Sequence, residues 1–163
     1  EKDHIASVCI RSAALYEAIG KPSEEVEKLK RAALLHDIGK ITIPSRIFNQ
    51  TQKLTKEEIA QIRTHPQASH QILRVMRDYE HFAEAVLYHH ERVDGTGYPE
   101  GLIGNEIPLE ARIIAIADAY EAMTSDRPYK KAMSKADAIK ELRACSGNQF
   151  DHTLVEIFID KVL

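Results

Sequence analysis

The stretch LEARIIAIADAYEAM, residues 109–123, decides how the rest of this chain must fold. Its spacing predicts a helix that starts just after Pro108 and is largely buried, because alanine, isoleucine and methionine dominate it. One carboxylate, Asp118, lies in the middle of this apolar surface. A buried carboxylate is unfavourable unless it is paired or bound to a cation, so the same helix indicates a polar site inside the fold.

The segments on both sides of this helix follow a helical pattern too. The expected boundaries are residues 4–19 ending at Gly20, a helix capped by Ser23 and running to Gly39, a capping box at residues 55–58, a break or restart at His65-Pro66, a helix over about residues 82–92, and two last helices capped by Ser134 and Asp151. No strand-like alternation of useful length and no linker divides the sequence. The pattern predicts one all-α domain of about seven helices over residues 1–163.

Composition narrows the class of protein. The 163 residues fit one domain, and 44% hydrophobic with 29% charged residues is ordinary for a globular chain that buries a core. The formal net charge of -3, with both signs interspersed, argues against binding to a nucleic-acid duplex. The apolar runs are too short to cross a bilayer. Two cysteines, Cys9 and Cys145, are too few for a disulfide framework, so we expect a cytoplasmic setting.

The first residues already read as the middle of a helix, and no methionine precedes them. We therefore expect this segment to have been cut from a longer protein that carries an upstream regulatory domain, either sensory or receiver.

Two doublets with histidine stand near predicted helix ends. His36-Asp37 lies at the predicted helix end in RAALLHDIGK (residues 31–40), and His89-His90 begins HHERVDGTGYP (residues 89–99). Neighbours on a helix point about 100° apart, so they do not easily share one small ligand sphere. A carboxylate, however, has two oxygens and can contact two metals. The doublets therefore favour a site with a pair of metal ions.

The ordinary alternative is that the histidines are surface or core residues without a ligand. That interpretation suits His70, His81 and His152, which stand alone. Two doublets at apolar helix ends, together with the buried Asp118, favour a shared site instead.

The order of motifs resembles the HD-GYP family, a branch of the HD superfamily of metal-dependent phosphohydrolases. The residues that carry the resemblance are His4, HDIGK (36–40), His65-Pro66, HHERVDGTGYP (89–99), Asp118, DRPYKK (126–131) and GNQFD (147–151). Known members hydrolyse the bacterial second messenger cyclic di-GMP. The combination of HDIGK, HHE, DGTGYP and DRPY is specific, whereas an HD dipeptide alone is weak.

The resemblance implies roles for individual residues. The metal ligands would be His4, His36, Asp37, His65, His89, His90 and Asp118. Asp37 would bridge two ions, and with Lys40 it would form the catalytic pair. Lys40, Arg127 and Lys130 would meet the substrate phosphates. Tyr98 would either bind substrate or support the site from behind, with docking of a protein partner as a lesser interpretation.

The implied cofactor is a pair of divalent ions, with iron or manganese favoured and nickel or zinc compatible. A metal-bridging hydroxide would open cyclic di-GMP to linear pGpG, with GMP as the expected further product. The alternatives are hydrolysis of another cyclic dinucleotide or nucleotide phosphoester, and a catalytically weak sensor or adaptor for cyclic di-GMP. An expected partner is a diguanylate cyclase (GGDEF) domain.

Overall fold

A computed structural model describes residues 2–49, 52–77, 79–126 and 131–163. Within these ranges the α-helices are α1 (Lys2–Ala18), α2 (Ser23–Leu35), α3 (Ser45–Asn49), α4 (Lys56–Ile62), α5 (His65–Leu73), α6 (Ala83–Leu87), α7 (Leu109–Thr124), α8 (Lys135–Ala144) and α9 (His152–Lys161). Three short 3-10 helices join them, η1 (Ile38–Thr42), η2 (Glu80–Phe82) and η3 (Gly104–Glu106). The described residues form no strand, only two isolated bridges, which confirms the all-α class.

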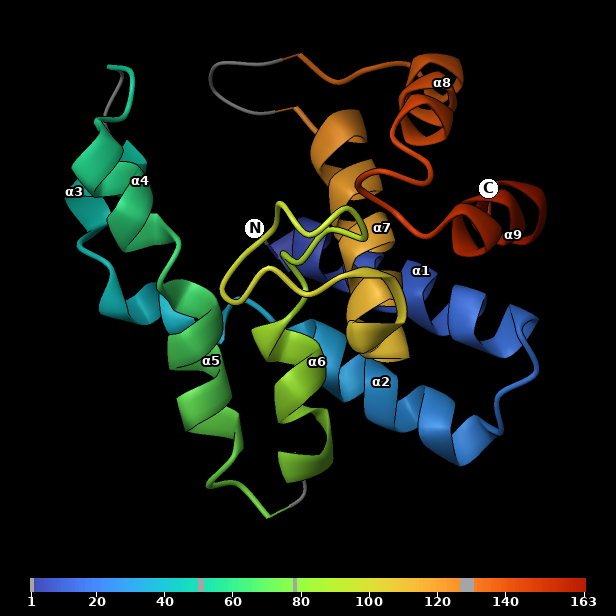
Figure 1. Ribbon diagram of the computed structural model, residues 1–163, viewed down its shortest axis with the longest axis horizontal. Helices are drawn as coiled ribbons and strands as arrows, with labels where there is room; N and C mark the ends of the chain where they lie inside the picture. Colours follow the sequence, from blue (N-terminus) through green and yellow to red (C-terminus); the bar gives the residue numbers. More distant parts are fainter. Residues whose placement is uncertain (1, 50–51, 78, 127–130) are drawn as a thin grey trace.

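Helix α7 runs through the middle of the molecule (Figure 1), with α1 packed against it and α2 packed against α1. Helices α8 and α9 lie at one end, and α3 and α4 lie at the other, next to α5. The core lies where α1, α2, α6, α7 and α9 converge, and it includes Leu15, Leu29, Val86, Ile113 and Phe158, each fully buried. Burying side chains of this size typically stabilises a fold by about 1.5–3 kcal/mol each.

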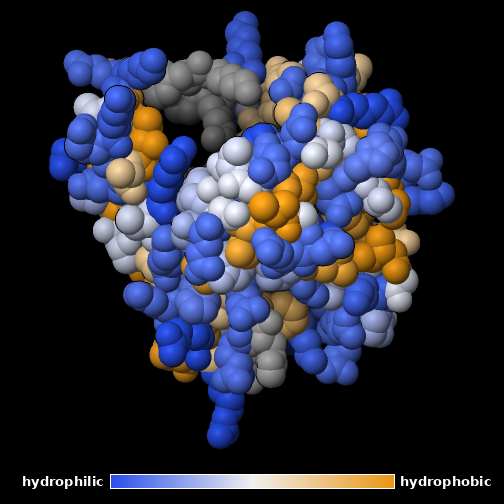
Figure 2. All heavy atoms as spheres, in the orientation of Figure 1, coloured by the Kyte–Doolittle hydropathy of each residue, from blue (hydrophilic) through white to orange (hydrophobic). Residues whose placement is uncertain are grey.

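The face of the molecule drawn in Figure 2 is predominantly polar. On the face shown in Figure 2, hydrophilic side chains cover most of the area, and apolar residues lie in small separate groups. Among the described residues, no helix has both the length and the apolar character needed to span a membrane.

Several predicted helix boundaries are confirmed. Thr55 forms the expected capping box with Glu58, while Ser134 and Asp151 accept hydrogen bonds from the first turns of α8 and α9. The chain restarts at His65, the first residue of α5, with Pro66 in its first turn, where a missing N–H costs nothing.

The prediction that the second helix runs from a Ser23 cap to Gly39 was wrong at both ends. Pro22 occupies the cap position without a side-chain bond. Helix α2 ends at Leu35, because the hydroxyl of Ser69 in α5 donates to the His36 carbonyl at 2.9 Å and accepts from the Gly39 amide at 2.8 Å. These tertiary bonds satisfy backbone groups that would otherwise extend the helix.

The predicted helix over residues 82–92 was also too long. Helix α6 ends at Leu87, and Tyr88 leaves helical geometry with φ -104° and ψ 10°. The described residues form nine α-helices, of which α3 and α6 have only five residues each, in agreement with the prediction of about seven helices. The consequence for the site is that both doublets lie in turns just beyond a helix end, where adjacent side chains can point the same way.

Candidate metal centre

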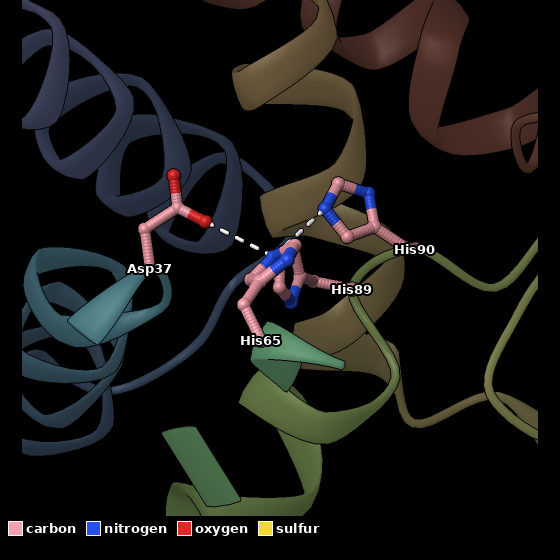
Figure 3. A group of neighbouring side chains, drawn as sticks. All are labelled: Asp37, His65, His89 and His90. Carbon is pink, nitrogen blue, oxygen red and sulfur yellow. Dashed lines mark hydrogen bonds and ion pairs between the residues drawn. The ribbon is translucent and has the colours of Figure 1, made fainter. Parts of the chain in front are cut away.

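The seven predicted ligands come from five parts of the fold and meet around Asp37. His4 lies in the first turns of α1, His36 and Asp37 follow α2, and His65 begins α5. His89 and His90 follow α6, and Asp118 projects from α7. Figure 3 shows Asp37, His65, His89 and His90 pointing toward one another from three of these parts.

The ligand atoms form two groups that share Asp37. Asp37, His65, His89 and His90 make one group, and His4, His36 and Asp37 make the other; within each group the atoms lie within 4.8 Å of one another. Asp118 extends the second group, because its Oδ1 lies 3.2 Å from His4 Nε2 and 3.9 Å from His36 Nε2.

Asp37 presents a different oxygen to each group. Its Oδ1 lies 3.1 Å from His65 Nε2, and its Oδ2 lies 3.4 Å from His36 Nε2. Two oxygens that face two sets of nitrogen ligands are the arrangement that a carboxylate needs to bridge two cations. Spacing of about 3.5–4 Å is usual for a pair of catalytic metals.

Backbone carbonyls orient three of the histidines. The Nδ1 atoms of His36, His65 and His89 lie 2.6, 2.7 and 2.6 Å from the carbonyl oxygens of Ala33, Ile62 and Val86. A carbonyl oxygen only accepts, so Nδ1 carries the proton in each neutral ring, and Nε2 keeps its lone pair. Metal-binding histidines usually have this outer hydrogen bond.

These residues fit metal ions. His36 Nε2, His89 Nε2 and Asp37 Oδ1 are buried and have no hydrogen-bond partner among the described residues. Buried polar atoms without a partner cost free energy, typically about 1–3 kcal/mol each, unless a ligand satisfies them. A cation coordinated by these atoms would remove that cost.

The electrostatics of the centre also favour cation binding. Burial opposes ionisation of Asp37, but the adjacent imidazoles of His36 and His65 outweigh it and hold the pKa of the carboxyl well below its usual range. Burial likewise opposes ionisation of Asp118, yet the hydrogen bond from His4 keeps its pKa low. Both carboxylates are therefore charged at neutral pH.

The histidines divide by their surroundings. Burial, followed by repulsion from His65, lowers the pKa of His90 to about 4. Burial and then His90 lower the pKa of His89 as well. Burial also acts against a charged His36, but the neighbouring Asp37 carboxylate raises its pKa overall. His89 and His90 are therefore neutral near pH 7, as metal ligation requires.

The residues expected to contact substrate have different outcomes. The Lys40 ammonium donates to Asp37 Oδ2, so Lys40 lies at the centre and not only at a helix end. The Tyr98 ring stacks on His90 with centroids 4.9 Å apart. Arg127 and Lys130 lie outside the described residues, and their role stays a prediction.

Three further residues support the centre and were missed in the sequence. Ser69 ties α5 to the turn that carries His36, and no local signal marks it. Glu91 is 4% exposed and accepts three backbone N–H groups from residues 100–102. The Arg63 guanidinium lies 5.1 Å from the centroid of the Tyr98 ring. Only Glu91 had a sequence signal, its position directly after the histidine doublet.

An all-α fold with a cluster of histidine and aspartate side chains is typical of helical metal-binding domains. Comparison with known protein families identifies the family to which the chain belongs. The HD domain family model matches residues 6–154. The chain therefore belongs to the HD domain family, and its relatives confirm the resemblance to the HD-GYP branch.

Two curated relatives illustrate the similarity. A protein of Pseudomonas aeruginosa named cyclic di-GMP phosphodiesterase is 41% identical over 160 residues, covering 98% of this chain and 38% of the relative. A protein of Vibrio cholerae named 3'3'-cGAMP-specific phosphodiesterase 2 is 37% identical over 158 residues, covering 96% of this chain and 30% of the relative. The chain thus spans well under half the length of these relatives.

A solved structure agrees with the fold. The HD-GYP-type protein Bd1817 of Bdellovibrio bacteriovorus superposes with a TM-score of 0.78 at 22% identity, covering 98% of this chain and 51% of that one. At this identity the likeness concerns the fold alone.

Proposed function

We propose that the chain is the catalytic domain of a metal-dependent phosphodiesterase that hydrolyses cyclic di-GMP to linear pGpG and then to GMP. The observation that carries the proposal is the pair of ligand groups that meet at Asp37. Imidazole and carboxylate ligands without thiolate suit a catalytic centre better than a structural zinc site. Several relatives bear the name cyclic di-GMP phosphodiesterase, which supports the choice of substrate.

The proposed centre holds two divalent ions, for which we favour iron or manganese. His4, His36 and Asp118 would hold one ion, and His65, His89 and His90 the other, with Asp37 between them. When bound, such a pair supplies Lewis acidity for a phosphate and a water molecule of lowered pKa.

The chain's own residues would do the remaining work. The Asp37 carboxylate offsets repulsion between two nearby cations. Lys40, already in contact with Asp37, places a positive charge where a phosphate oxygen can approach. Arg127 and Lys130 are proposed to meet phosphates from the segment that follows α7, and the planar guanidinium of Arg127 suits two phosphate oxygens. No serine or cysteine nucleophile is required.

A second substrate has support from two curated relatives that are named 3'3'-cGAMP-specific phosphodiesterases. The Vibrio cholerae relative named 3'3'-cGAMP-specific phosphodiesterase 2 matches 96% of this chain. Metal ligands act on the phosphodiester and do not read the base, so they do not separate the two cyclic dinucleotides.

The test is turnover by the purified protein loaded anaerobically with Fe²⁺ or with Mn²⁺. Cyclic di-GMP and 3'3'-cGAMP are supplied separately, and the products are separated by chromatography. We expect pGpG to form first from cyclic di-GMP and GMP to follow. Tight binding of cyclic di-GMP without product would contradict the proposal and identify a sensor or adaptor. Faster turnover of 3'3'-cGAMP than of cyclic di-GMP would identify 3'3'-cGAMP as the preferred substrate.

We also propose neighbouring domains, a partner and a cellular location for this chain. Because the chain spans well under half of its relatives' length, an upstream regulatory domain and a diguanylate cyclase (GGDEF) partner are expected around it. A cytoplasmic location fits a nucleotide second messenger.

A further inference from the structure

His90 differs from the other central histidines in how its ring is held. His36, His65 and His89 each bond to a backbone carbonyl through Nδ1. Among the described residues, no such carbonyl holds His90. Its ring instead packs on the Tyr98 ring, with centroids 4.9 Å apart and planes 24° from parallel. The aromatic stack thus occupies the role that a carbonyl has for the other three.

Tyr98 is itself placed from two sides. Its backbone N–H donates to the His90 carbonyl at 3.2 Å. The Arg63 guanidinium lies 5.1 Å from the Tyr98 centroid. Gly97 brings this part of the loop directly onto the backbone that follows His90, because a Cβ there would lie 2.6 Å from Glu91 Cα and 2.4 Å from Arg92 N.

Glu91 holds the far end of the same loop. Its Oε1 accepts from the N–H groups of Glu100 at 2.7 Å and Gly101 at 3.0 Å, and its Oε2 accepts from Leu102 at 3.1 Å. The side chain is 4% exposed and forms no ion pair among the described residues. A buried carboxylate is tolerated without a cation when charge-assisted bonds of this kind surround it. A carboxylate buried against three backbone amides indicates that this end of the loop is held in one place.

We propose that Glu91 is a positioning residue for the metal centre: it closes residues 91–102 into a fixed loop, and this loop holds Tyr98 against His90 so that the imidazole faces the ions. The inference rests on the proposed function only in requiring a metal at His90. It identifies the DGTGYP motif as support for one metal ligand, and the Arg63 guanidinium lies over the same Tyr98 ring.

The test measures the affinity of both sites for Mn²⁺ by competition with a chromophoric chelator. Tyr98→Leu removes the aromatic ring, Tyr98→Phe keeps it, and Glu91→Gln removes the charge that holds the loop. Glu106→Gln is the matched control, because Glu106 accepts the N–H of Ile103, the residue directly after the loop, but is exposed.

We expect Glu91→Gln and Tyr98→Leu each to lower the affinity for one ion by about 10- to 100-fold and to leave the affinity for the other ion unchanged. A loss of this size is usual when a residue that supports a metal ligand is removed. Tyr98→Phe and Glu106→Gln should bind both ions like the unmodified protein. The Glu91→Gln/Tyr98→Leu double variant should bind that ion no more weakly than the more affected single variant does, because both substitutions act through the His90 ring.

Wild-type affinity at both sites in Tyr98→Leu would overturn the inference, as would additive losses in the double variant. If Glu91→Gln does not fold, Glu91→Asp, which keeps the charge but loses the reach to the three amides, replaces it with the same expected loss. A protein that binds two ions but hydrolyses no cyclic dinucleotide contradicts the proposed function, and the affinities still decide this inference.

Discussion

At the scale of single residues, Asp37 is the point where both ligand groups meet. One oxygen faces His65 and the other faces His36, and Lys40 contacts the same carboxylate. A neutral amide at this position would keep the shape and remove the charge. We therefore expect the carboxylate to matter for ion binding more than for the fold.

Asp37→Asn should make one of the two ions labile and lower turnover by several orders of magnitude, because cation repulsion is less compensated. The melting temperature of the metal-free protein should change little. Metal content, turnover and melting temperature measured on one preparation check this. Asp160→Asn, whose side chain is 70% exposed on α9, is the control and should leave all three unchanged. A fully active Asp37→Asn protein with two ions would sink the mechanism.

Arg127→Ala should raise KM through weaker phosphate binding and leave metal content unchanged. Arg127 lies outside the described residues, so the prediction rests on the DRPY motif. Arg143→Ala, which removes an exposed cation on α8, serves as the control and should not change KM. Loss of metal from Arg127→Ala would show that this residue belongs to the centre itself.

His90 should make the stability of the metal-free protein depend on pH. Its pKa is about 4 in the folded chain, mainly through burial, and 6.5 when unperturbed. The unfolded chain binds a proton there that the folded chain does not. The stabilisation is therefore complete above about pH 6.5 and is lost as the pH falls toward 4.

In His90→Gln, the melting temperature should fall less steeply between pH 6.5 and 4 than in the unmodified protein. His152→Gln, at an exposed position, is the control and should preserve the slope. An unchanged slope in His90→Gln would place the pH dependence elsewhere.

At the scale of elements, the centre depends on how closely α5 approaches η1. Gly39 makes this approach possible, because a Cβ there would lie 2.2 Å from the His65 carbonyl oxygen and 2.6 Å from Ser69 N. Both neighbours are backbone atoms, which cannot move aside separately. The contact sets the distance between His65 on α5 and Asp37 before η1.

Gly39→Ala should push α5 away from η1, lower the melting temperature and weaken metal binding at the His65 group. Gly20→Ala is the control: a Cβ at Gly20 meets no atom within 4 Å, but its φ of +85° disfavours a side chain. That variant should lose about 1–2 kcal/mol of stability and keep its metal affinity. Equal metal affinity in Gly39→Ala would mean that the two elements are not in fixed register.

At the scale of the whole molecule, bound ions should stabilise the fold by linking distant elements, because their ligands come from α1, α5, α7 and the turns after α2 and α6. We expect about two ions per chain. An ion at 100 times its Kd adds about 2.7 kcal/mol to the free energy of unfolding. For a domain of this size that corresponds to roughly 5–10 °C in melting temperature per ion.

Chelation followed by stepwise reloading, monitored by metal analysis and calorimetry, measures both quantities. Magnesium, which prefers oxygen ligands, is the control ion and should stabilise much less. A protein that is fully active with no more than one ion would contradict the two-metal centre.

The sequence by itself determined the all-α class, the caps at Thr55, Ser134 and Asp151, and the presence of a carboxylate on the apolar helix α7, although the Asp118 side chain is half-buried and not fully buried. These features are local: helical spacing and capping side chains act within a few residues of the groups they satisfy. The two doublets and Asp118 pointed to a metal site from the pattern alone, and the resemblance to HD-GYP proteins completed the set of seven ligands with His4 and His65. All seven lie together, although the ion that each would bind stays a prediction.

Only the tertiary structure decided where α2 and α6 end, and therefore how the two doublets reach one centre. Ser69 bonds to the His36 carbonyl from 33 positions away and to the Gly39 amide from 30 positions away, and Glu91 accepts amides that follow it across a loop. Helix propensity cannot register a hydrogen-bond partner that arrives from another element. The same reason hid Arg63 and Gly39, because their contacts with Tyr98 and α5 exist only once distant segments are packed together.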